Sequence, residues 1–143
     1  MGKITFGVIG FGHIGKKHAL MVSGNAESEL KAVVDTDAEK LNQAKELYPN
    51  IQVFESIEDL IEANLDLNVV NVCTPNGLHA DHSLKAIEFG KHVVIEKPMA
   101  LSKKDCENVI SKALNKNKKR EANASRFLLY TFYILNNKYH YLV

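Results

Sequence analysis

The sequence predicts an α/β fold in which a doubly wound, mainly parallel sheet is covered by helices on both faces, with an atypical C-terminal tail. Two observations predict this fold. Short apolar runs alternate with helix-like segments from residue 3 to residue 116, and such alternation is typical of sheets built from βαβ units. The fourth run, NVVNVCTP, has the near-continuous apolar character of a strand that is buried on both faces.

The composition is that of one globular domain. The chain has 143 residues, of which 45% are hydrophobic and 24% charged. Its net charge of +1 gives no reason to expect nucleic acid or a membrane surface as a partner. No stretch approaches the roughly 18 apolar residues of a spanning helix, and the first residues lack the features of a signal peptide. Two cysteines are too few for a disulfide framework, so we expect a cytoplasmic protein.

Five strands are predicted from short runs rich in Val and Ile. In chain order they are residues 3–10, 29–35, 52–54, 68–75 and 91–96. Gly10 ends the first run and Asp35 ends the second. The fifth strand cannot continue through Pro98, because proline has no N–H to donate to a neighbouring strand.

Five helices are predicted between and after these strands. They are residues 13–24, 36–49, 55–65, 78–90 and 102–116. Glycine at 24 and 90 is expected to end the first and fourth helices. Capping pairs with the spacing S-x-x-D open the third and fifth helices, at Ser56 with Asp59 and at Ser102 with Asp105.

The carboxyl ends of parallel strands lie along one edge of a sheet, where ligands bind in open α/β folds. Four segments are expected at this edge: Gly10 to Gly15, Asp35, Thr74 to Asn76, and Glu96 to Pro98. The unusual chemistry of the sequence is concentrated in these four segments. Their coincidence predicts a binding site more strongly than any one motif does.

The first segment fits the pattern G-x-G-x-x-G through Gly10, Gly12 and Gly15. It follows a strand and opens a helix, the context in which this pattern indicates a dinucleotide site. The glycines would permit a tight turn, approach of a pyrophosphate and close packing of the helix, whose N-terminus would hold the phosphates. The loop residues expected to line the cofactor are Gly10, Phe11, Gly12, His13, Ile14 and Gly15. The alternative is a glycine-rich structural turn.

Asp35 lies twenty residues after Gly15, where a carboxylate can accept hydrogen bonds from the adenosine ribose. A 2′-phosphate would meet this carboxylate as a like charge, so we expect NAD rather than NADP. The alternative is that Asp35 caps the next helix, a role open also to Thr36 or Asp37. Lys16 and Lys17 leave NADP open as the less favoured cofactor.

Thr74, Pro75 and Asn76 end the fourth strand, where the nicotinamide half of the cofactor is expected. Pro and Asn are also ordinary turn residues, so a plain strand-to-helix turn is the alternative. His79 is expected in the first turn of the next helix, near the cofactor. With His82 it could suggest a metal site, but no third ligand is evident and we predict no metal.

Lys97 follows the fifth strand, between Glu96 and Pro98. A cation beside a nicotinamide can bond the substrate hydroxyl that loses a hydride, and can relay its proton. Glu96 would orient this ammonium or a ribose, and Pro98 would fix the backbone direction. From the residues alone, a solvated lysine beside a proline turn is the alternative.

These motifs resemble the N-terminal cofactor domain of the Gfo/Idh/MocA oxidoreductases. The matching pieces are GVIGFGHIGKKHA, AVVDTD and VVNVCTPNGLHADHSLKAIEFGKHVVIEKPMAL, within residues 3 to 115. The resemblance implies a Rossmann-like domain and an NAD(P)-dependent reaction on sugars, cyclitols or nucleotide sugars. It implies that four residues lie on the nicotinamide side of the cofactor: Thr74, Pro75, Asn76 and His79. It also implies that Glu96 and Lys97 are the glutamate and lysine of the E-K-P motif of the family, in which the lysine contacts the reacting hydroxyl of the substrate.

The resemblance also implies a second domain that holds most of the substrate pocket and the oligomer interface, for which this chain has no counterpart. We therefore expect a dinucleotide-binding domain over residues 1–116 and an atypical tail over 117–143, of the kind a truncated or frame-shifted gene would encode. Three functions stay open: an oxidoreductase represented by its cofactor domain, a non-catalytic NAD-binding module, and an inactive fragment. Substrate identity and self-association are left open.

Overall fold

The computed structural model of the chain describes residues 2–121, 130–131, 133–135 and 138–140. Its main sheet contains β1 (Ile4–Ile9), β2 (Ser28–Val34), β3 (Gln52–Phe54), β4 (Val69–Val72), β5 (His92–Ile95) and β6 (Tyr130–Thr131). All neighbours pair in parallel, in the order β3-β2-β1-β4-β5-β6. The predicted doubly wound parallel sheet is confirmed. β7 (Tyr133–Leu135) and β8 (Lys138–His140) form a separate antiparallel pair.

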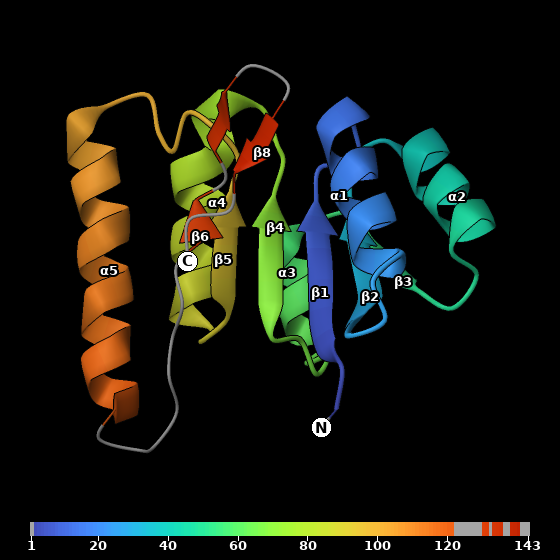
Figure 1. Cartoon of the computed structure of the whole chain (residues 1–143), viewed down its shortest axis with the longest axis horizontal. Helices are drawn as coiled ribbons and strands as arrows, with labels where there is room; N and C mark the ends of the chain where they lie inside the picture. Colours follow the sequence, from blue (N-terminus) through green and yellow to red (C-terminus); the bar gives the residue numbers. More distant parts are fainter. Residues whose placement is uncertain (1, 122–129, 132, 136–137, 141–143) are drawn as a thin grey trace.

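The helices are α1 (His13–Ser23), α2 (Ala38–Leu47), α3 (Ile57–Glu62), α4 (His79–Glu88) and α5 (Lys103–Glu121), with a short 3₁₀ turn, η1 (Asn76–Leu78), before α4. In Figure 1, α1 and α2 lie at one end of the sheet, and α4 and α5 lie at the other. Each of the five predicted strands and five predicted helices is present, with ends shifted by a few residues.

Two apolar cores lie on opposite faces of the sheet. Ile9 packs with α3, α4 and α5 in one core, whereas its neighbour Val8 packs with α1 and α2 in the other. Val34 and Val33 of β2 divide in the same way. Because successive residues of a strand point to opposite faces, a strand between two helix layers must be apolar throughout, which explains the continuous runs in the sequence.

The helix ends follow the signals in the sequence. The hydroxyls of Ser56 and Ser102 accept the backbone N–H of the aspartate three residues later, each at 3.1 Å. Asp37 caps α2 by accepting the N–H of Glu39 at 3.0 Å. Gly90 follows α4 with a φ of +73°, the left-handed conformation that favours glycine at a helix end.

The alternation of strands and helices continues further than expected. The last helix was predicted to end at residue 116, but α5 runs to Glu121 and is followed by β6, whose Tyr130 pairs with Val94 of β5. The extension was missed because residues 115–121 lack apolar periodicity, although lysine, arginine and glutamate are good helix formers. The predicted domain boundary at 116 stays a prediction. Expectations that concern residues 122–129, 132, 136–137 and 141–143 lie outside the described residues.

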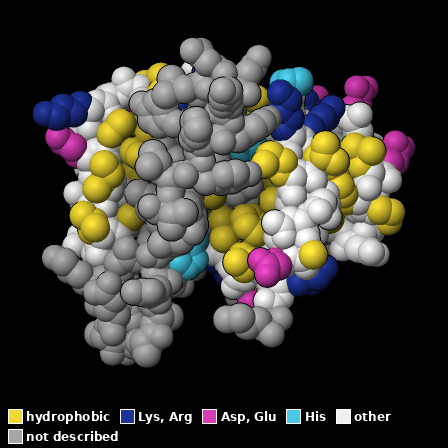
Figure 2. Space-filling model, in the orientation of Figure 1, with side chains coloured by type: hydrophobic (Ala, Val, Ile, Leu, Met, Phe, Trp, Pro, Cys, Tyr) yellow, Lys and Arg dark blue, Asp and Glu magenta, His cyan; other side chains and the backbone are white. Residues whose placement is uncertain are grey.

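No helix among the described residues is long and apolar enough to cross a membrane. On the face shown in Figure 2, the acidic and basic side chains of the described residues occur in small separate groups around the rim.

Candidate functional site

Backbone hydrogen bonds join the four predicted segments at the carboxyl edge of the sheet. Gly10 donates its N–H to Val34, the residue before Asp35, at 2.7 Å. Cys73 donates to Ile9 at 2.8 Å, and Glu96 donates to Val72 at 3.1 Å. The glycine loop, Asp35, the end of β4 and the E-K-P turn are therefore neighbours. The sheet order reverses between β1 and β4, the place at which open α/β sheets bind their ligands.

The three glycines of the loop have different surroundings. Gly10 has a φ of +87°, and a Cβ there would lie 2.7 Å from the carbonyl oxygen of Cys73. A Cβ on Gly15 would lie 1.8 Å from the carbonyl oxygen of Gly10, so the helix can approach the loop only without a side chain. A Cβ on Gly12 would meet nothing within 4 Å. Gly10 and Gly15 thus shape the loop, while Gly12 leaves open space beside it.

The first turn of α1 begins at this open space. Gly12 is the N-cap and provides no side-chain hydrogen bond to the free N–H groups of the helix. His13 is exposed and Ile14 is half-buried, whereas the Phe11 side chain is fully buried in the core under α1 and α2. Lys16 places its Nζ 5.7 Å from the centroid of the Phe11 ring. The loop thus offers backbone amides and a helix N-terminus, a combination that suits an anion.

Asp35 is nearly buried, with its side chain 8% exposed, and it also organises the loop. Its Oδ2 accepts the backbone N–H of Phe11 at 2.7 Å, and its Oδ1 accepts the N–H of Asp37 at 3.0 Å. The half-exposed Lys40 lies 3.4 Å from Oδ1. The carboxylate therefore holds the glycine loop against the end of β2. The sequence did not reveal the contacts with Phe11 and Lys40.

The end of β4 presents an exposed turn to the same edge. Pro75 and Asn76 are exposed, and Asn76 begins the 3₁₀ turn that leads into α4. Thr74 is half-buried, and its Oγ1 lies 3.2 Å from Nδ1 of His82. Burial lowers the pKa of His82 from its ordinary value of 6.5.

The side chains of the E-K-P motif differ in their exposure to solvent. Lys97 and Pro98 are exposed, and the peptide bond between them is cis. Glu96 instead is 6% exposed and turns inward, where Oε1 lies 2.8 Å from Nε2 of His18 on α1. The partner that the structure gives this carboxylate is His18 on α1. That Glu96 orients the Lys97 ammonium or a ribose stays a prediction.

The surroundings of Glu96 favour its charged form. Burial by itself raises the pKa of the carboxyl, but His18 and the backbone N–H of Lys97 more than offset this, so the pKa lies below its ordinary value of 4.5. The neighbouring Cys73 shows the opposite effect. Its thiol pKa is raised by burial and then by the charge of Glu96, so the thiol stays neutral.

No motif in the sequence pointed to His18. Its Nδ1 lies 3.1 Å from Nδ2 of Asn71, so one histidine joins α1 to β4 and β5. Two signals were available. His18 is next to Ala19, a buried residue on the side of α1 that packs against the sheet. Asn71 is a polar residue within the otherwise apolar strand β4. A polar residue on each of two buried surfaces suggests that they meet.

His79 lies in the first turn of the helix that follows β4, as the sequence predicted. It begins α4 near the carboxyl edge, but it is only 1% exposed, and both ring nitrogens face backbone carbonyl groups. A direct contact with the cofactor is therefore not supported by its position. Among the described residues, no group of three His, Cys, Asp or Glu side chains could hold a metal ion.

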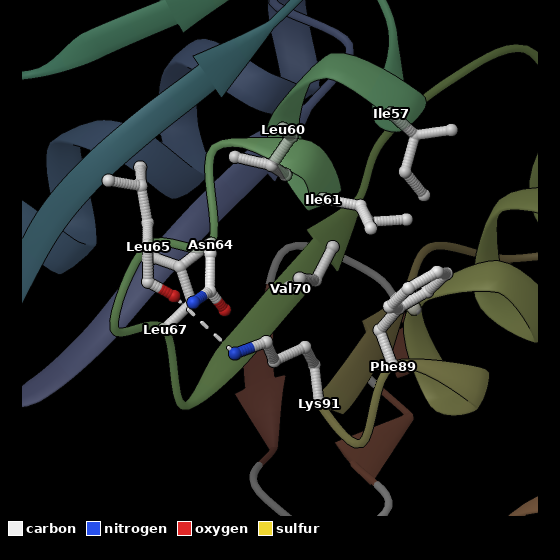
Figure 3. A pocket seen from close by; sticks show the side chains of 10 residues that line it. Ile57, Leu60, Ile61, Asn64, Leu65, Leu67, Val70, Phe89 and Lys91 are labelled. Atoms are coloured by element: carbon white, nitrogen blue, oxygen red, sulfur yellow. Dashed lines mark hydrogen bonds between the residues drawn. The ribbon is translucent and has the colours of Figure 1, made fainter.

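A small apolar pocket of about 70 Å³ lies away from this edge. It is formed by α3, the segment before β4 and the end of α4, where Leu60, Leu65 and Phe89 contribute to its wall (Figure 3). Lys91 at its rim lies 3.5 Å from the carbonyl oxygen of Leu65. Because it opens near the amino ends of β4 and β5, this pocket is separate from the four segments described above.

Comparisons with known proteins agree with this geometry. The model of an oxidoreductase family with an NAD-binding Rossmann fold, Gfo/Idh/MocA, matches residues 4–123. Inositol 2-dehydrogenase of Rhizobium meliloti is 37% identical over 107 residues, which are 74% of this chain and 30% of the relative. A 1-carboxy-3-chloro-3,4-dihydroxycyclohexa-1,5-diene dehydrogenase of Comamonas testosteroni is 40% identical over 106 residues, covering 72% of this chain and 26% of the relative.

Among solved structures, the WlbA dehydrogenase from Bordetella pertussis in complex with NADH and UDP-GlcNAcA superimposes with a TM-score of 0.81 at 27% identity. The superposition covers 92% of this chain and 36% of that protein. The chain therefore spans about a third or less of the length of the proteins it matches. The matched part contains the glycine loop, Asp35 and the E-K-P turn.

Proposed function

Because the chain belongs to the Gfo/Idh/MocA family of NAD-binding oxidoreductases, we propose that it is the cofactor-binding part of an enzyme that transfers hydride between a nicotinamide and a sugar, cyclitol or nucleotide sugar. The observation that carries this proposal is the shared sheet edge. The glycine loop, Asp35 and Lys97 come from strands that are neighbours around the reversal of sheet order. This arrangement suits an extended dinucleotide with its reacting end beside an exposed lysine.

The glycine loop and Asp35 would hold the adenosine half of NAD. The pyrophosphate would lie over Gly12, where there is room for it, against the N–H groups that open α1. Asp35 would accept hydrogen bonds from the ribose with the lone pairs left by its contacts with Phe11, Asp37 and Lys40. Its negative charge favours NAD over NADP, because a 2′-phosphate would be repelled.

Thr74, Pro75 and Asn76 would lie along the nicotinamide half. The exposed side chains of Pro75 and Asn76 offer an apolar surface and a hydrogen-bonding amide, respectively. Lys97 would donate a hydrogen bond to the oxygen of the substrate hydroxyl and stabilise the charge that develops there as the hydroxyl proton is lost to water, while the bound cofactor would accept the hydride from the carbon that bears this oxygen. Because Lys97 is exposed and Glu96 is turned inward, the lysine is the group of this motif that can reach a substrate.

Nucleotide-linked sugars are the substrate class that two observations support. The segment TPNGLHADH resembles members of the family that act on nucleotide-linked sugar acids. The WlbA dehydrogenase is bound to such a compound, UDP-GlcNAcA, together with NADH. Cyclitols are the alternative class, because inositol 2-dehydrogenase is also a relative.

A graft tests hydride transfer directly. Residues 4–123 of this chain would replace the matching segment of the Rhizobium meliloti inositol 2-dehydrogenase, and NADH formation would be followed with inositol. We expect activity in the graft and its loss in the graft carrying Lys97→Met. Full activity in the graft carrying Lys97→Met would contradict the proposed role of this lysine, and a folded graft that binds NADH but is inactive with Lys97 in place would contradict the proposed hydride transfer.

A further inference from the structure

His79 connects two segments of the proposed site. Its Nδ1 lies 2.7 Å from the carbonyl oxygen of Pro98, and its Nε2 lies 2.7 Å from the carbonyl oxygen of Thr74. Pro98 belongs to the turn that carries Lys97, and Thr74 lies in the loop between β4 and η1. The ring is 1% exposed, so water does not compete for either nitrogen.

The two partners of the ring determine where its protons must be. A carbonyl oxygen can only accept a hydrogen bond, whereas a neutral imidazole has one N–H and one bare nitrogen. In a neutral His79, the lone pair of the bare nitrogen would face a carbonyl oxygen at 2.7 Å, which is repulsive. Turning the ring by 180° would place carbon atoms against both oxygens and lose both hydrogen bonds. Only the doubly protonated ring satisfies both carbonyl groups.

The distances agree with a charged donor. Hydrogen bonds from a cationic nitrogen are typically about 2.7–2.9 Å long, shorter than the common length of about 2.9–3.0 Å for neutral N–H donors. Both contacts of His79 lie at the short limit of this range. The contact of His82 with Thr74 is longer, at 3.2 Å.

A buried cation requires compensation by nearby groups. Glu96 at the end of β5 supplies a negative charge that interacts with His79 more weakly than with His18, whose Nε2 lies 2.8 Å from Oε1 of the same carboxylate. His82, on the same helix, is the like charge that opposes it, but burial lowers the pKa of His82 and favours its neutral form. Cys73 at the end of β4 is a neutral thiol. Lys97, in the turn itself, is exposed to solvent.

We propose that His79 is held as an imidazolium that ties the turn of Lys97 and Pro98 to the end of β4 and so positions Lys97. His79 is thus a positioning residue rather than a ligand of the cofactor. The consequence for catalysis rests on the proposed function, because the position of Lys97 matters for hydride transfer. The protonation state and the tie between the two segments do not depend on it.

Nuclear magnetic resonance of the ¹⁵N-labelled 143-residue chain without cofactor tests the protonation state. The ring nitrogens of His79 would be followed from pH 6 to pH 8.5, with the His79→Gln variant assigning the signal and the exposed His13 as internal reference. We expect both nitrogens of His79 to keep their protons at pH 7.5. One bare nitrogen on His79 at that pH would overturn the proposal.

Hydrogen exchange of the backbone around Lys97 tests the positioning role. Glutamine has one amide donor group and cannot bond the two carbonyls as the ring does, so His79→Gln should speed exchange in residues 97–102 by about tenfold or more. His82→Gln, one turn along the same helix, should leave it unchanged. Equal exchange in both variants would overturn the role. If His79→Gln does not fold, the resonance measurement on the unchanged chain decides, with the ring signals of His79 assigned by through-bond correlation to its own backbone amide. Failure of NADH binding would count against the proposed function alone.

Discussion

Nε2 of His18 lies 2.8 Å from Oε1 of Glu96, and this contact joins the helix of the glycine loop to the strand end that carries Lys97. Both side chains are largely buried, at 13% and 7% exposure. Asn71 of β4 holds the other ring nitrogen of His18. The phosphate side and the lysine side of the proposed site are therefore connected through the interior of the domain as well as through the sheet.

Removal of His18 should destabilise the domain because it leaves the Glu96 carboxylate buried without its partner. We expect His18→Ala to lower the free energy of unfolding by about 2 to 3 kcal/mol. Urea unfolding followed by circular dichroism measures this change. Lys31→Ala is the matched control, since it removes an ion pair with Glu29 that is half-exposed on both sides and should cost less than about 1 kcal/mol. Equal losses in the two variants would contradict the assigned role.

The stability of the domain should depend on the charge of Glu96. Its pKa is lowered in the folded state, so the carboxylate contributes stability that is present above its ordinary value of 4.5 and is lost as the pH falls through the lower folded value. Glu96→Gln removes this titration. Unfolding free energies measured between pH 7 and pH 3 should therefore fall less steeply in Glu96→Gln than in the unchanged chain. Parallel curves would show that Glu96 is not the group responsible.

The glycine loop offers a matched pair of substitutions. Gly15→Ala places a methyl group 1.8 Å from a backbone oxygen and should destabilise the domain by about 2 kcal/mol or more. Gly12→Ala has open space and an ordinary φ of −76°, so its effect should stay below about 1 kcal/mol. Thermal or urea unfolding compares them. A larger loss in Gly12→Ala would contradict the described loop geometry.

Cofactor choice should follow the charge of Asp35. Asp35→Asn keeps the size of the side chain but removes the charge. We expect it to weaken NADH binding by about tenfold and to reduce the preference of the chain for NADH over NADPH. Asp37→Asn removes the same charge two residues away, and asparagine preserves the cap of α2. Calorimetric titration should therefore show an unchanged preference in Asp37→Asn. A similar shift in both variants would indicate a general effect of charge.

Local patterns in the sequence predicted most of the fold. Strand and helix periods, the S-x-x-D caps and the glycine loop each depend on residues within a few positions of one another. The contacts between distant residues could not be read in this way. Glu96 and His18 are 78 positions apart, and Phe11 and Asp35 are 24 apart. Their pairing depends on how α1 packs on the sheet, which hydrophobic periodicity does not specify. The same limit applied to His79, because its carbonyl partners are backbone atoms that no side-chain motif reveals.

Calorimetric titration of the unchanged chain and of Gly12→Ala with NADH tests most directly whether the open side of the glycine loop binds a dinucleotide. The unchanged chain should bind NADH saturably. Gly12→Ala, with the same unfolding midpoint, should bind roughly tenfold more weakly or not at all, because its methyl group fills the space assigned to the pyrophosphate. No binding by the folded, unchanged chain, or equal binding by both, would contradict the account.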